Sequence, residues 1–154
     1  MSHPAQLSRL RGMKQQSGRN PHNSTDCQIL LAAVLFHFLL TSLHGFAHTR
    51  AKVVMSNAAM GFVFCVILIG PILGIIVQRI ALPRGGAWAI AGMMITALVY
   101  GLANHFLIPG SDHVNNVDKP WHALFSMTAA LLVPAEAFGA AVAIWCAMRA
   151  GRQS

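Results

Sequence analysis

Residues 27–48 read CQILLAAVLFHFLLTSLHGFAH, a stretch without a single Asp, Glu, Lys or Arg. A helix rises about 1.5 Å per residue, so roughly 20 apolar residues cross the hydrocarbon core of a bilayer. Three further apolar blocks follow at residues 57–77, 86–108 and 121–148. None shows the period-two alternation of a strand, and a helix satisfies its backbone hydrogen bonds in lipid. The sequence predicts an all-α integral membrane protein: a four-transmembrane-helix antiparallel bundle over residues 27–148.

The composition supports a lipid environment. The chain has 154 residues, of which 55% are hydrophobic and 10% charged, whereas soluble globular domains carry about 25% charged residues. A formal net charge of +7 would suit nucleic acid, but the cations flank the apolar blocks or lie in the N-terminal tail. That arrangement is typical of residues that orient a membrane protein. We therefore expect the lipid bilayer as the main partner and no nucleic acid.

The distribution of cations predicts the orientation. Eight cations fall on one side of the expected bundle: Arg9, Arg11, Lys14, Arg19, Arg79, Arg84, Arg149 and Arg152. Three fall on the other: Arg50, Lys52 and Lys119. Because the cationic side stays in the cytoplasm, we expect both termini to be cytoplasmic in an inner (plasma) membrane. Residues 1–26 then form a flexible basic cytoplasmic tail, and residues 149–154 a second, short one.

This topology gathers histidines and acids on the outer side. The candidate ligands there are His44, His48, His105, Asp112, His113 and His122. His44 and His48 are four residues apart on one helix, the spacing at which two imidazoles grip one metal ion. Transition-metal sites draw three or four such ligands from different elements. Imidazole and carboxylate ligands favour zinc, copper(II), nickel or iron, so the sequence predicts transition-metal binding at this outer-face His/Asp cluster.

Two titratable residues fall near the middle of predicted spans. His37 lies in the first block and Glu136 in the fourth, and Glu136 is the only acid inside an apolar block. Ionisable groups in a membrane face the bundle interior, so we expect the two to form a buried polar pair. The pair either fixes the register of the two helices or serves a proton or substrate path.

A further set of polar residues is expected to line a cavity or to form hydrogen bonds between helices. Its members are Thr41, Tyr100, Asn104 and Ser126. Tyr100 and Asn104 are four residues apart along one side of the third helix, whereas the α-helical wheel turns His105 away from that side.

Two segments, LHGFAHTRA at 43–51 and NHFLIPGSDHV at 104–114, followed by the stretch 136–139, resemble a family of bacterial four-span membrane proteins without an assigned activity. More distantly, YGLAN at 100–104 and AMG at 59–61 are similar to the heme-containing styrene oxide isomerases and hydroxylaminobenzene mutase-like proteins. The second resemblance implies an isomerase-type enzyme with heme b. In those proteins the second span carries a histidine, and here it has none.

Three functions stay open at this point. The first is a metal-binding membrane protein. The second is a membrane enzyme, heme-dependent or cofactor-free, that acts on a lipophilic small molecule. The third is a structural or accessory subunit of a membrane complex or a homo-oligomer.

Overall fold

A computed structural model describes residues 25–117 and 119–152, and the predicted tail at 1–26 lies almost entirely outside them. The described residues form helices and no strand. The first span is α2 (Thr25–Arg50), and the second combines α3 (Asn57–Phe62), η2 (Val63–Ile69) and α4 (Gly70–Ile80). The third is α5 (Pro83–Leu102) with η3 (Ala103–Leu107), and the fourth is α6 (Lys119–Ala150). All four are long and apolar enough to cross a membrane, which confirms the predicted helical spans.

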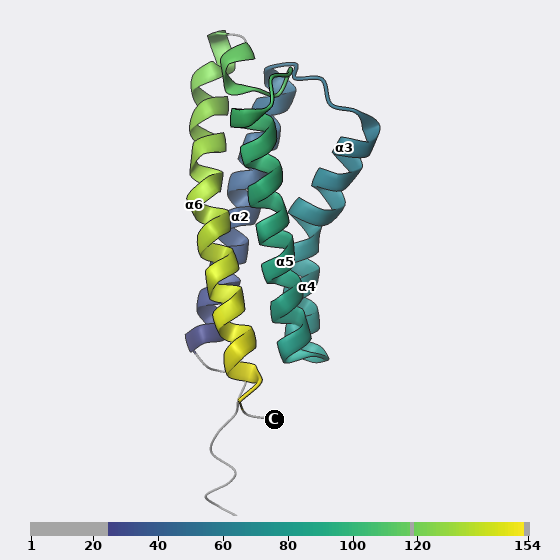
Figure 1. Ribbon diagram of the computed structural model, residues 1–154, viewed down its shortest axis with the longest axis vertical. Coiled ribbons are helices and arrows are strands. Elements are labelled where there is room, and N and C mark those ends of the chain that lie inside the picture. Colours follow the sequence, from purple (N-terminus) through teal and green to yellow (C-terminus); the bar gives the residue numbers. More distant parts are fainter. Residues whose placement is uncertain (1–24, 118, 153–154) are drawn as a thin grey trace, which may run out of the picture.

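The four spans run up and down in turn (Figure 1). The start of α2 and the end of α6 lie at one end of the bundle, the terminus end, and the long connection after η3 lies at the other, the loop end. α6 packs against α2 and α5, and α5 packs against α4, whereas α2 has little contact with the second span. At the loop end α3 leans away from the other helices (Figure 1). The bundle is therefore least closed between its first and second spans.

Two spans contain π-helical segments. η2 leads directly into Gly70 and Pro71, and Pro71 occupies the first turn of α4. Proline lacks an N–H and its ring crowds the preceding turn, so Pro71 disfavours a regular α-helical ladder in the turn before it. In η3 the π-helical turn carries His105. Such single wide turns rotate the side chains that follow them, and they recur at functional sites.

Small residues allow the helices to approach closely at the terminus end. The core there contains Ala87, Ala91, Ala143 and Ala147, each almost fully buried. α5 begins at Pro83, three residues before the predicted start at 86, because proline is well suited to the first turn of a helix. Gly85 and Gly86 are consequently helical.

Gly86 makes the closest approach in this core. A Cβ atom at Gly86 would lie 2.4 Å from the backbone nitrogen of Gln78, on the neighbouring helix. Gly86→Ala must therefore push α4 and α5 apart, and we expect it to lower the free energy of unfolding by about 1–3 kcal/mol. Gly92, on the same helix, has no atom within 4 Å of the same position. Gly92→Ala is the matched control. Equal free energies of unfolding for the two variants, measured by denaturant titration in detergent, would contradict this packing.

Candidate metal centre

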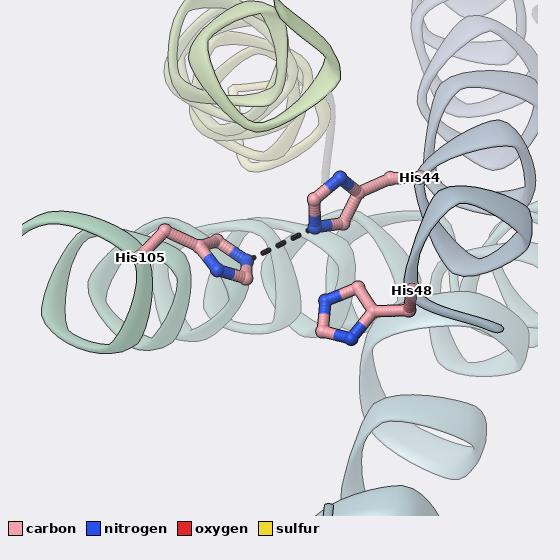
Figure 2. A group of neighbouring side chains, drawn as sticks. All are labelled: His44, His48 and His105. Carbon is pink, nitrogen blue, oxygen red and sulfur yellow. Dashed lines mark hydrogen bonds between the residues drawn. The ribbon is translucent and has the colours of Figure 1, made fainter. Parts of the chain in front are cut away.

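Three histidines from two spans meet at the loop end of the bundle. His44 and His48 come from α2 and His105 from η3, and their ring nitrogens point toward a common space (Figure 2). One ligand nitrogen from each residue lies within 4.8 Å of the others. His44 and His105 are buried and His48 is half-buried. We call these residues the three-histidine cluster.

A hydroxyl on α6 contacts His44 and favours one tautomer of its ring. His44 Nδ1 lies 2.8 Å from Thr128 Oγ1. The Thr128 hydroxyl donates its only proton to the backbone carbonyls of Leu124 and Phe125, at 2.7 and 3.0 Å. A Thr128 hydroxyl engaged in this way favours accepting from the imidazole, which favours the His44 tautomer with its proton on Nδ1. The Nε2 atom of neutral His44 is left with a free lone pair.

The backbone carbonyl of Asp112 fixes His105 in the same way. His105 Nδ1 lies 3.0 Å from this oxygen, and a carbonyl oxygen only accepts hydrogen bonds. The proton of neutral His105 therefore also sits on Nδ1. Its Nε2 atom carries a lone pair as well.

The two lone-pair nitrogens face each other. His44 Nε2 and His105 Nε2 are 3.1 Å apart (Figure 2). Two acceptors at this distance repel unless a proton or a metal cation lies between them. Two imidazole nitrogens bound to one tetrahedral zinc ion at about 2.0 Å are themselves about 3.3 Å apart. The spacing and the tautomers of the pair thus both suit a metal ion.

Asp112 connects the other two histidines. Its Oδ1 atom lies 3.0 Å from His48 Nε2 and 3.2 Å from His105 Nδ1. Burial acts to raise the pKa of the Asp112 carboxyl, but the contacts with His105 and His48 outweigh burial and hold this pKa well below its ordinary value. Asp112 is therefore a carboxylate at neutral pH. It contacts His105 on the side of the ring away from His44, as carboxylates commonly do around metal-bound histidines. It contacts His48 at Nε2, the nitrogen that faces the other two rings.

Hydrogen bonds hold in place the connection that carries Asp112. Ser111 Oγ donates to the carbonyl of Val54 in the first connection, at 3.1 Å. Asn116 Nδ2 donates to the carbonyl of Gly110 at 2.7 Å. These bonds hold the loop over the bundle end, where Asp112 can reach η3 and α2.

An aromatic ring covers the cluster on the α6 side. Phe125 is fully buried, and its ring centroid lies 4.9 Å from those of His44 and His48 and 5.4 Å from that of His105. This contact excludes water from one side of the imidazoles.

Of the six predicted ligands, Asp112 contacts two rings of the three-histidine cluster without belonging to it, and two others lie apart from it. His113 precedes the short helix η4 (Val114–Asn116), and its Nδ1 accepts from the backbone N–H of Asn115 at 3.2 Å. His122 is exposed on the first turns of α6. Neither joins His44, His48 and His105 in the group of side chains close enough to share an ion.

A cavity of about 490 Å³ extends from the cluster into the bundle. We call it the central cavity. Thr41, Tyr100, Glu136 and all three histidines border it. Asn104 borders a smaller cavity of about 190 Å³ near the surface and donates to the carbonyl of Tyr100 at 2.8 Å. Ser126 borders neither of these two cavities.

The predicted pair of His37 and Glu136 forms. His37 Nε2 lies 3.5 Å from Glu136 Oε1, with side-chain exposures of 1% and 5%. Thr41 Oγ1 lies 3.2 Å from the same imidazole nitrogen. The pair joins α2 to α6 below the three-histidine cluster. It fixes the relative height of the two helices, because shifting either one would leave a buried charged or polar group without its partner.

The sequence did not single out Thr128, and the predicted orientation of the His105 side chain is wrong. Thr128, Leu132 and Glu136 are four residues apart and all buried, so the position of Glu136 on the inner face marked Thr128 as a candidate. His105 was expected to point away from Tyr100. The π-helical turn of η3 places both at the central cavity.

Searches with models of protein families, among curated proteins and among solved structures found no match to this chain.

The bond between His44 and Thr128 can be tested by substitution. In Thr128→Val the buried Nδ1–H of His44 loses its acceptor, and we expect a loss of about 1–3 kcal/mol in the free energy of unfolding. Thr128→Ser keeps the hydroxyl and should keep most of that stability. The ¹⁵N resonances of the His44 ring should show the proton on Nδ1 in the wild-type protein. A proton on Nε2 would overturn the assigned tautomer.

Proposed function

We propose that this chain is a multi-pass membrane protein that binds one transition-metal ion through His44, His48 and His105. The observation that carries the proposal is the contact of two imidazole nitrogens, His44 Nε2 and His105 Nε2, at 3.1 Å, with the ring of His48 beside them. Their protons are directed to the opposite side of each ring by Thr128 and by the carbonyl of Asp112. A metal-bound histidine in proteins has this arrangement, with its second nitrogen donating to a fixed acceptor.

A third imidazole favours a metal ion over a shared proton. A proton between His44 and His105 would need only two nitrogens, whereas His48 also turns toward them (Figure 2). His48 Nε2 faces the pair, with Asp112 Oδ1 at 3.0 Å, whereas His48 Nδ1 is buried on the far side of the ring without a hydrogen-bond partner (Figure 2). Three imidazoles with a carboxylate beside them suit zinc, copper(II), nickel or iron.

Heme b fits this arrangement less well. Axial ligands lie on opposite faces of a porphyrin, and the ring extends well beyond the iron between them. The Nε2 atoms of His44 and His105 are 3.1 Å apart, and Phe125 packs against both rings. An ion fills such a space and a porphyrin does not.

The cations support an orientation with the cluster on the outer face of the plasma membrane. Arg79, Arg84, Arg149 and Arg152 lie near the terminus end of the described bundle, and Arg50, Lys52 and Lys119 lie near the loop end. With the eleven cations of the full sequence divided eight to three, both termini are cytoplasmic and the metal reaches the cluster from outside. In this proposal the chain belongs with the bacterial four-span proteins that its loop segments resemble. A subunit role in a membrane complex is compatible with it.

Titration of the purified protein with zinc tests the proposal. We expect one equivalent to bind and to raise the free energy of unfolding by about 2.7 kcal/mol at a free zinc concentration of 100 times the Kd. His44→Ala and His105→Ala should each abolish stoichiometric binding. Elemental analysis after gel filtration measures the metal, and thermal unfolding measures the stabilisation.

His122→Ala is the matched control, because it removes an exposed histidine outside the cluster. It should bind zinc as the wild type does. If His122→Ala lowers binding as much as His44→Ala, or if the wild type binds no zinc, copper, nickel or iron, the proposal is wrong.

A further inference from the structure

The central cavity continues from the three-histidine cluster between all four spans. Its volume of about 490 Å³ lies within the range of small-molecule sites, about 300–1,000 Å³. Away from the histidines its walls come largely from apolar side chains, among them Val63, Ile67 and Leu68 of η2 and Ala97 of α5. A space of this kind suits an apolar molecule.

The cavity opens between the first and second spans. Ser42 and Thr49 border it from α2, and Met60 and Phe64 border it from α3 and η2, and all four are exposed. The hydroxyls of Ser42 and Thr49 donate back to carbonyls of their own helix, at 2.7 and 3.0 Å. Hydroxyls satisfied in this way tolerate contact with lipid. Because these helices cross the membrane, the opening faces the bilayer.

The polar groups of the cavity are concentrated around one glycine. A Cβ atom at Gly101 would lie 3.9 Å from Glu136 Oε2 and 3.9 Å from His105 Cδ2. The missing side chain of Gly101 therefore leaves space between a buried carboxyl group and the cluster. Glu136 is 4% exposed, borders the cavity and uses its other oxygen toward His37. A ligand placed here meets a hydrogen-bonding group on one side and the metal ligands on the other.

Three protein ligands leave a further position on the metal. Zinc sites with three protein ligands take a water or a substrate as the fourth. All three histidines border the central cavity, so the open position faces it.

We propose that the central cavity binds a neutral, lipid-soluble molecule whose oxygen-bearing head lies at Gly101, between the metal ion and Glu136. This inference rests on the proposed metal site. The apolar part of the ligand lies along η2, and the ligand enters from the bilayer between α2 and α3. An oxygen atom of its head takes the open position on the metal.

The test uses protein loaded with cobalt(II), because the visible spectrum of cobalt reports a change of ligand. Octanohydroxamic acid is the probe, and acetohydroxamic acid has the same head without the tail. Gly101→Phe and Leu68→Trp each fill part of the cavity, the first near the cluster and the second at a distance from it. Gly92→Phe is the matched control on α5, since Gly92 is exposed with open space around it.

In the wild type and in Gly92→Phe we expect octanohydroxamic acid to change the cobalt spectrum in a saturable way. Leu68→Trp should weaken its binding at least about tenfold and leave acetohydroxamic acid binding within about twofold. Gly101→Phe should weaken both probes. The cobalt content of each variant is measured after gel filtration. If Gly101→Phe does not retain cobalt, the comparison of Leu68→Trp with Gly92→Phe decides the test.

The outcomes separate the two proposals. Failure of the wild type to bind cobalt overturns the metal site itself. Cobalt bound without a spectral response to octanohydroxamic acid, or with an equal response in Leu68→Trp and Gly92→Phe, leaves the metal site standing and overturns the ligand cavity.

Discussion

The contact between His44 Nε2 and His105 Nε2, at 3.1 Å, is the constraint on which the loop end of the bundle depends. In the neutral tautomers that Thr128 and the carbonyl of Asp112 favour, both atoms carry a lone pair. In water two such imidazoles would turn away from each other or take up solvent. Inside the bundle each ring is held by a helix and a fixed acceptor, so a shared proton or a metal ion between them would offset their repulsion.

The remainder of the bundle positions this contact. Close packing of alanines and glycines holds α4, α5 and α6 together at the terminus end. The pair of His37 and Glu136 sets the height of α2 against α6. The π-helical turn of η3 brings His105 to the side of Tyr100 and into line with His44. The looser fit of the second span leaves the central cavity beside the cluster. The packed helices α2, α5 and α6 thus support the histidines, and the opening beside the second span gives access to them.

Much of this could be predicted from the sequence. Length and hydropathy were sufficient for four spans, because a membrane helix needs no partner to satisfy its backbone. Spacings of four, three and four residues place His37, Thr41, His44 and His48 along one side of α2. Glu136 is the only acid within an apolar block and therefore the expected partner of His37. The direction of His105 could not be predicted, since a wheel of 3.6 residues per turn does not anticipate a π-helical turn. His113 and His122 share the outer side with the cluster, but the side of a membrane does not determine which side chains meet. Nothing in the sequence immediately around Thr128 distinguishes it from other threonines of a transmembrane helix, and only its neighbours in the structure reveal its contact with His44.

X-ray absorption at the zinc edge, on protein loaded with one equivalent of zinc, tests the central claim most directly. The account predicts about three imidazole nitrogens at about 2.0–2.1 Å from the metal, with the outer-shell scattering of the imidazole rings and one further light atom. A first shell of oxygen atoms without imidazole scattering, or one that is the same in His105→Ala as in the wild type, would contradict it.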